Sequence, residues 1–433
     1  MSQLQLQLFN YQVEGVKFLS TAFRAMLGDQ PGLGKTAQAI CAAQKVFVHK
    51  TPSICVICPK TALTNWQREW DRWWPGFMGY LRVVNYDRMS IDTRERTLFE
   101  NTTWDLIICD EAHRLKSPGA QRTKTIYRKA IRDRNHTRVW LLTGTPARNH
   151  AGELWTHLVS LRPDLILDRS GRPMSQEQFE DHFCKVGFDK FGNRVIRGSS
   201  LKNLPELRDL LRKSGFLLRR MKKDVQGSLP PLIFDEYPLA DPQNMPVASF
   251  PDFEKLGLRT DMSFEEMAEV LREKGTEFST ERRLTGVLKA HAVSDFVETE
   301  LEAPGKIIVF YHHRDVGDRL AERLVLHNPA RVDGRTKNAQ AEVDSFQTDP
   351  ECRVFLGQIS ACGEALNITA ATQVVFAEAS WSPSDNYQAA CRAHRIGMGD
   401  SLVVRFLSAG GTIDEIIQRV LRRKTQELTE LFD

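Results

Sequence analysis

Long apolar runs are missing from this sequence. No stretch of eighteen consecutive apolar residues occurs, and the opening segment MSQLQLQLFNYQ lacks the basic and apolar regions of a signal peptide. These absences argue against a membrane partner and predict a soluble intracellular protein. We expect it in the cytoplasm of a prokaryote or of a phage-infected host cell, and in the nucleus if its source is eukaryotic.

A strong charge of one sign is also missing. The chain has 59 Lys and Arg against 55 Asp and Glu, for a net charge of +4. A balance this small does not identify a nucleic-acid-binding protein, because many neutral enzymes share it. Local basic clusters at 219–223 (RRMKK) and 422–424 (RRK) are, taken alone, typical of solvated helix faces.

Paired cysteines are scarce. The eight cysteines are scattered along the chain, and the only close pair is Cys55 and Cys58. Residues three apart on a β-strand point to opposite faces, so a shared metal ion or a disulfide is not expected. Reduced, buried thiols are the default in an intracellular protein.

The sequence does contain a regular alternation of short apolar runs with longer amphipathic segments. The apolar runs are rich in Val, Ile, Leu and Phe, as strands buried on both faces should be, and the alternation favours parallel α/β sheets. Predicted strands lie at 53–58, 81–84, 106–109, 139–142, 306–311, 354–357, 373–376 and 402–406, and predicted helices include 35–46, 315–326 and 386–395.

Two such series occur, separated by a middle segment that indicates mainly helix and loop. We therefore predict an α/β fold with two parallel-sheet lobes and a helical insertion after the first. The expected domains are lobe 1 at 1–150, the insertion and the end of lobe 1 at 151–240, a hinge and helical lead-in at 241–300, and lobe 2 at 301–433.

A glycine-rich loop at 28–36 (GDQPGLGKT), followed at once by a helical pattern, is the strongest local signal. Glycines let backbone amides turn towards phosphate oxygens, and the N-terminus of the following helix adds positive potential. Lys35 is expected to reach the outer phosphates of ATP, and Thr36 to provide its hydroxyl oxygen to Mg²⁺. The strict pattern G-x-x-x-x-G-K-[ST] requires glycine where Asp29 stands, so the match is imperfect when the loop is taken alone.

An acidic pair, Asp110 and Glu111, follows a predicted apolar strand. The end of such a strand is where a parallel sheet presents side chains to a bound nucleotide. Asp110 is expected to hold Mg²⁺, and Glu111 to orient and polarise the attacking water. An isolated Asp-Glu pair is commonly just solvated, but the glycine-rich loop upstream makes the catalytic interpretation the stronger one.

Two arginines of the second lobe, Arg392 and Arg395, are candidates to complete the site. They are three residues apart, so a helix would put both on one face. Arginines presented to a γ-phosphate stabilise the charge that develops during phosphoryl transfer, an effect worth roughly 10³–10⁵ in rate. An ordinary salt-bridged helix is the alternative for these two residues.

These motifs, in this order, resemble those of superfamily-two helicases, and specifically the Swi/Snf-type family of double-stranded DNA translocases, over nearly the whole chain. The resemblance implies two RecA-like lobes, ATP and Mg²⁺ as cofactors, and duplex DNA bound without sequence specificity. LFNYQVEGV at 8–16 is similar to the family's opening segment, whose glutamine, here Gln12, contacts the adenine edge. The family loop also has aspartate at the position of Asp29, and the resemblance assigns nucleotide contacts to Asp29, Gly32, Leu33, Gly34, Lys35 and Thr36.

Other matches imply DNA contacts. VICPKTALTNW at 56–66 resembles the strand and loop that touch the DNA backbone, and DEAHRLK at 110–116 is close to the family's acidic motif. A translocase must hold phosphates without reading bases, so by position the expected contacts are Lys60, Thr61, Arg114 and Lys116. Trp66, Trp73 and Trp74 offer rings for stacking on bases, but packing is the better interpretation for tryptophans spaced along an amphipathic helix.

Coupling residues are implied by two further segments. LLTGTP at 141–146 resembles the segment that couples hydrolysis to lobe movement, and GEALNITAA at 363–371 resembles the motif before the arginine helix. The coupling residues are therefore expected to be Thr143, Gly144, Thr145 and Gly363. FLLRRMKKDV at 216–225 is similar to the family's helical signature ahead of the hinge, which replaces the solvated-face interpretation of that basic cluster.

The branch of the family and the reaction stay open at this point. KIIVFYHHRD at 306–315 and LTGVLKAHAV at 284–293 lean towards the annealing-helicase branch. The family usually has an acidic pair where Ala390 and Cys391 stand and glutamine at Met398, so contacts around the arginine helix are expected to differ. The alternatives to a duplex translocase are a strand-separating DNA or RNA helicase and a nucleic-acid-binding scaffold with weak ATPase activity.

Overall fold

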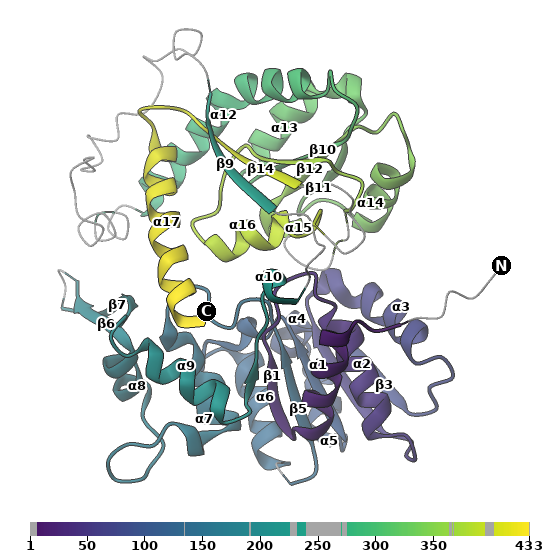
Figure 1. Cartoon of the computed structure of the whole chain (residues 1–433), viewed down its shortest axis with the longest axis vertical. Helices are drawn as coiled ribbons and strands as arrows, with labels where there is room; N and C mark the ends of the chain where they lie inside the picture. The colour runs from purple at the N-terminus through teal and green to yellow at the C-terminus, as the bar shows by residue number, and fades with distance from the viewer. Residues whose placement is uncertain are drawn as a thin grey trace. The chain divides into compact units, whose positions relative to one another are not determined.

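Figure 1 shows the computed structural model, which describes residues 7–133, 135–189, 192–225, 232–239, 270, 275–362, 366, 368–394 and 402–432. The chain divides into two compact units, the first built mainly from residues up to Gly227 and the second mainly from residues between Ser228 and Gln426. Each unit has its own parallel sheet and its own apolar core. No helix in the described part of the chain is both long and apolar enough to cross a membrane.

The first unit is built around a six-stranded parallel sheet. Its strand order is β3-β2-β4-β5-β1-β8. The middle of the sheet is buried on both faces, since the consecutive residues Ile107 and Ile108 are both fully buried. The register is regular: Met26 of β1 pairs with Leu141 on one side and with Leu217 on the other. The strands are β1 (Arg24–Leu27), β2 (Ser53–Cys58), β3 (Tyr80–Asn85), β4 (Leu106–Asp110), β5 (Arg138–Leu142) and β8 (Leu217–Leu218).

Helices flank this sheet (Figure 1). Several begin at a side chain that satisfies the free amides of the first turn, as Asn85 does for α4 and Asp92 for α5. The helices are α1 (Asn10–Thr21), α2 (Lys35–Val46), α3 (Leu63–Trp73), α4 (Tyr86–Ile91), α5 (Thr93–Asn101) and α6 (Gln121–Arg132), with the 3₁₀ turns η1 (Lys60–Ala62) and η2 (Ala112–Leu115).

The insertion between β5 and β8 is helical, with one hairpin. Helix α8 begins with a capping box. The Ser175 hydroxyl accepts from the Gln178 backbone amide at 3.2 Å, and the Gln178 side-chain oxygen accepts from the Ser175 backbone amide at 2.8 Å. The segment contains η3 (Ala151–Leu154), α7 (Trp155–Leu161), η4 (Pro163–Leu165), α8 (Gln176–Phe183), the antiparallel strands β6 (Cys184–Phe188) and β7 (Arg194–Ser199), and α9 (Leu204–Lys213).

The second unit repeats the parallel-sheet plan. Its strand order is β11-β12-β10-β13-β14-β9. Ile308 of the central strand pairs with Phe355 and with Val374. The strands are β9 (Leu232–Pro238), β10 (Ile307–Tyr311), β11 (Ala330–Val332), β12 (Val354–Gln358), β13 (Gln373–Phe376) and β14 (Leu402–Ser408); the helical segments are α12 (Gly275–Glu300), α13 (Arg314–Arg323), η6 (Val325–His327), α14 (Ala339–Thr348), α15 (Ile359–Cys362), α16 (Pro383–Ala390) and α17 (Ile413–Phe432).

The predicted fold class is confirmed: two parallel α/β sheets are present, and all eight predicted strands lie on observed ones. Three local features differ from expectation. Residues 232–238, which were expected in the end of lobe 1, form strand β9, and β9 pairs with β14 in the second sheet. The segment 216–225, expected to be helical, contributes β8 and only the short helix α10 (Lys222–Val225). The helix predicted over 386–395 ends at Ala390, because the chain turns at 391–393.

Candidate nucleotide site

The sequence-predicted residues of the first unit meet at one edge of its sheet. The glycine-rich loop follows β1, Asp110 ends β4, and Thr143 follows β5. These three strands are neighbours and run parallel, in the order β4-β5-β1, so their carboxyl ends lie side by side. The carboxyl edge of a parallel sheet is where ligands bind in open α/β folds.

The glycine-rich loop has the backbone that a phosphate cradle requires. Gly32 and Gly34 have φ values of 90° and 73°, which non-glycine residues rarely adopt. Helix α2 begins at Lys35, so the free amides of its first turn open onto the loop. The Lys35 ammonium spans the loop and donates to the Asp29 carbonyl at 2.7 Å. The Lys35 ammonium therefore lies on the concave side of the loop, beside the backbone of Asp29.

Gln12 lies directly against this loop. Its Nε2 donates to the Leu33 carbonyl at 3.3 Å, and its Oε1 accepts from the Phe9 amide at 3.0 Å. The side chain is buried. Helix α1 thus delivers the glutamine to the glycine-rich loop, and its contact with adenine stays a prediction.

Replacing Gly34 with alanine is expected to weaken nucleotide binding. The new Cβ would lie 2.4 Å from Gln12 Nε2, and the positive φ would be strained. Left-handed backbone costs an L-residue about 1–2 kcal/mol, and a loop that shifts to relieve it loses roughly ten-fold in affinity. Titration with a fluorescent ATP analogue measures this. Gly119→Ala is the control, because nothing lies within 4 Å of a Cβ there; wild-type affinity in Gly34→Ala would contradict the cradle.

Asp29 is not turned towards the cradle but buried beneath it. Its carboxylate is fully buried and accepts from the Arg220 guanidinium, with Nε to Oδ1 at 3.0 Å and Nη2 to Oδ2 at 2.5 Å. Gln38 of α2 donates to the same carboxylate at 3.2 Å and accepts from Arg220 at 2.8 Å. Both oxygens of this side chain are therefore bound inside the fold, and the nucleotide contact predicted for Asp29 stays a prediction. The Asp29 side chain ties the glycine-rich loop to Arg220 and Gln38.

The sequence did not identify Arg219 and Arg220 as residues that support the nucleotide site. Both follow β8, the strand that extends the sheet beyond β1. Arg219 donates to the carbonyls of Gly28 at 2.8 Å and Gly144 at 3.1 Å, so it joins the loops that follow β1 and β5. The solvated-face interpretation of this cluster is wrong, since Arg220 is only 8% exposed. The one sequence signal was the family-like pattern at 216–225.

The acidic pair is held from several sides. Asp110 Oδ1 accepts from the Glu111 amide at 3.0 Å, and Oδ2 accepts from the Trp66 indole at 2.8 Å. The Tyr86 hydroxyl donates to the Asp110 carbonyl at 2.7 Å. Burial and the neighbouring charge of Glu111 raise the pKa of Asp110, while the Trp66 hydrogen bond and the charge of Lys35 oppose that rise. Asp110 is only partly exposed, so its negative charge is poorly solvated and would be stabilised by a bound cation.

A polar path leads from Glu111 to the loop after β5. His113 Nδ1 lies 3.3 Å from Glu111 Oε2 and 3.3 Å from the Thr143 hydroxyl. The same hydroxyl accepts from the Thr145 amide at 3.1 Å. Glu111 itself has φ 49°, a left-handed conformation rare for a non-glycine residue. His113 therefore connects Glu111, the predicted catalytic base, to Thr143, and the Thr143 hydroxyl in turn binds the Thr145 amide.

The predicted DNA contacts fall into two groups. Lys60 and Thr61 are exposed on η1. Lys116 instead donates to Glu153 at 2.5 Å. Burial alone would raise the pKa of Glu153, but the charge and hydrogen bond of Lys116 outweigh it and bring that pKa to about 2. Lys116 is therefore a partner of Glu153 in the fold, and Arg114 is only half-exposed.

In the second unit, only part of the predicted site lies among the described residues. Arg392 follows α16 in a turn, is 7% exposed, and accepts through its carbonyl from the Ile368 amide at 3.0 Å. Helix α16 ends at Ala390, so Arg392 does not lie on it. Arg395 and Gly363 lie outside them.

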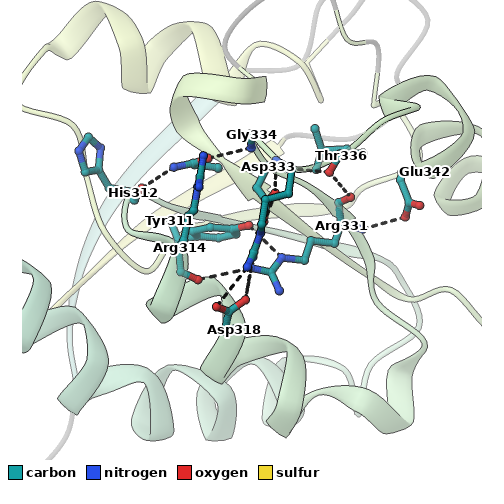
Figure 2. Close-up of polar contacts among 12 residues, drawn as sticks. Tyr311, His312, Arg314, Asp318, Arg331, Asp333, Gly334, Thr336 and Glu342 are labelled. Atoms are coloured by element: carbon teal, nitrogen blue, oxygen red, sulfur yellow. Dashed lines mark hydrogen bonds and ion pairs between the residues drawn. The ribbon is translucent and has the colours of Figure 1, made fainter.

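The carboxyl edge of the second sheet carries a charge-balanced network, drawn in Figure 2. Asp318 of α13 accepts from Arg331 at 2.6 Å and from Arg335 at 2.7 Å. Arg335 also pairs with Asp333 at 2.7 Å, and Arg331 donates to the Tyr311 hydroxyl at 3.2 Å. Two arginines thus compensate two aspartates. The network fixes the loop after β11 at the edge where β10 and β12 also end.

Profiles of two known domains match this chain. That of the SNF2-related domain matches residues 11–93 and 81–235, and that of the helicase conserved C-terminal domain matches residues 288–397. The chain is 30% identical to the DNA annealing helicase and endonuclease ZRANB3 of Bos taurus and of Homo sapiens, over 98% of this chain but only 40% of each relative. It also aligns with the Sulfolobus solfataricus SWI2/SNF2 ATPase core in complex with dsDNA, at 21% identity and a TM-score of 0.44, covering 99% of this chain and 97% of that one.

Proposed function

Since this chain belongs to the SNF2-related family, whose domain profile spans more than half of it, we propose that it is a DNA-stimulated ATPase that couples ATP hydrolysis to movement on duplex DNA. One observation carries the proposal. The glycine-rich loop with Lys35 and the acidic pair Asp110 and Glu111 converge at one sheet edge. A phosphate cradle beside a partly exposed carboxylate pair is the arrangement that nucleotide hydrolysis requires.

The residues of the first unit fit ATP and Mg²⁺. Gly32 and Gly34 have positive φ, a backbone that lets the amides of the loop turn towards a ligand. Lys35 would hold the outer phosphates, and Thr36 with Asp110 would hold Mg²⁺, which neutralises phosphate charge when bound. Glu111 would orient the attacking water and take its proton. In keeping with the family resemblance, Arg392 and Arg395 would supply positive charge to the transferred phosphoryl group.

Duplex DNA is the proposed nucleic-acid partner along which the protein moves. Support comes from the family membership and from the exposed Lys60 and Thr61 on η1, which suit phosphate contacts. Affinity should fall with salt as counterions are released, and should be similar for unrelated sequences. Strong base specificity would contradict a translocase.

The deciding experiment is the ATPase rate without nucleic acid and with duplex DNA, single strands, forks or RNA. We expect duplex-containing DNA to stimulate most. A strand-displacement assay run beside a triplex-displacement assay separates the main alternative, a strand-separating helicase. Displacement of the triplex without unwinding is the expected result, and unwinding without triplex displacement would overturn the proposal.

Thr143→Val is expected to slow turnover while leaving nucleotide affinity intact. Valine keeps the volume but removes the hydroxyl that joins His113 to the Thr145 amide. Loss of such an outer contact should lower the DNA-stimulated kcat by roughly ten-fold. Thr123→Val is the matched control, because the Thr123 hydroxyl is buried and has no hydrogen-bond partner among the described residues. Equal effects of the two substitutions would rule out a coupling role.

A further inference from the structure

Trp66 makes a contact that a packing tryptophan does not need. It lies in the first turn of α3 and is fully buried. Its indole Nε1 donates to Asp110 Oδ2 at 2.8 Å. A buried indole N–H usually finds a partner, but here the partner is the carboxylate proposed to hold Mg²⁺. The packing interpretation of this residue is therefore incomplete.

The indole completes the support of that carboxylate. Asp110 Oδ1 already accepts from the Glu111 amide, and Tyr86 holds the Asp110 carbonyl. With Trp66 on Oδ2, each carboxylate oxygen accepts one hydrogen bond, so rotation about the Cβ–Cγ bond is opposed from both sides. Each oxygen keeps acceptor capacity for a cation. Trp66 and the Glu111 amide together fix the plane in which Asp110 presents its oxygens.

Helix α3 connects the Trp66–Asp110 hydrogen bond to the 3₁₀ turn η1. It begins at Leu63, directly after η1, which carries Lys60 and Thr61. The helix has eleven residues, and at its far end the rings of Trp70 and Trp74 stack on each other at 5.8 Å. A helix this short moves as a unit, so a displacement of η1 reaches Trp66 one turn later.

We propose that Trp66 is a positioning residue that links phosphate binding at η1 to the orientation of the Asp110 carboxylate. DNA bound at Lys60 and Thr61 fixes the start of α3, and the indole transmits this position to the metal ligand. This inference rests on the proposed function. It goes further by naming the side chain through which DNA raises the ATPase rate.

The test compares Trp66→Phe with Trp70→Phe. Both residues are buried in α3, and each substitution removes the same atoms, but the Trp70 indole has no hydrogen-bond partner among the described residues. For Trp66→Phe we expect the DNA-stimulated kcat to fall by roughly ten-fold and the Mg²⁺ concentration for half-maximal rate to rise. Its DNA affinity, measured by fluorescence anisotropy with a labelled duplex, should match that of Trp70→Phe. The Mg²⁺ dependence of fluorescent-ADP binding gives a readout independent of turnover.

A second variant separates the hydrogen bond from the ring. Benzothienylalanine at position 66 keeps the bicyclic shape but replaces the N–H with sulfur, and it should reproduce the Trp66→Phe defect. Equal losses in Trp66→Phe and Trp70→Phe, or full DNA stimulation with benzothienylalanine, would overturn the link. If the wild-type chain shows no ATPase activity with any of the nucleic acids, the proposed function itself is contradicted.

Discussion

Glu111→Gln is expected to abolish steady-state ATP turnover while ATP and DNA still bind. The substitution keeps the size and hydrogen-bonding reach of the side chain but removes the carboxylate that would accept a proton from water. Loss of a general base costs roughly 10²–10⁴ in rate. The backbone at this position has φ 49°, and glutamine meets the same constraint there as glutamate, so the loop should keep its shape. Phosphate release measured with and without duplex DNA gives the rate.

Lys35→Ala separates binding from chemistry in the same assay. Removing the ammonium that now donates to the Asp29 carbonyl should weaken ATP binding as well as turnover, whereas Glu111→Gln should weaken turnover alone. Glu206→Gln serves as the control for a carboxylate in the same unit, because its side chain is 64% exposed. Full ATPase activity in Glu111→Gln would contradict the assignment of the catalytic base.

The elements that carry this chemistry could be predicted because their signals are local. Strand β2 and helix α2 have the predicted bounds, since a six-residue apolar run is too short for a typical helix and the segment 35–46 has a helical period. The loop between β1 and α2 was identified from its glycines, and the two with positive φ are those that the cradle requires. The acidic pair follows from its place at the end of β4.

The partners that support the site could not be predicted, because they lie far apart in the chain. Asp29 and Arg220 are 191 residues apart, and Trp66 and Asp110 are 44 apart. Periodicity reports which face of an element is apolar, but not which polar side chains meet across elements. Strand β8 has only two residues, too few for a pattern, yet it brings Arg220 under the loop.

The same limit explains Arg392. The apolar and polar pattern over 386–395 suits a helix, but α16 ends at Ala390, where the Cys391 amide bonds back to the Tyr387 carbonyl and the chain turns. The Arg392 carbonyl then accepts from the Ile368 amide, a contact made by a residue 24 positions earlier. Tertiary hydrogen bonds such as this one override a marginal helix end.

Arg220→Met is expected to be the most destabilising single substitution in the first unit. It would leave the fully buried carboxylate of Asp29 without its guanidinium, and breaking one partner of a buried ion pair costs about 3–5 kcal/mol. It would also free the Tyr11 carbonyl and Gln38, both of which Arg220 contacts. Because Asp29 belongs to the glycine-rich loop, ATP affinity should fall with stability.

Urea unfolding with and without nucleotide measures both effects, and Arg88→Met is the control because that guanidinium is 59% exposed beside Glu95. The double variant Asp29→Gly, Arg220→Met removes both charges and restores the glycine of the strict loop pattern. It should recover much of the stability lost in Arg220→Met, since no uncompensated charge stays buried. If Arg220→Met is no less stable than Arg88→Met, or if the double variant is the less stable of the two Arg220 variants, the buried pair does not hold the loop.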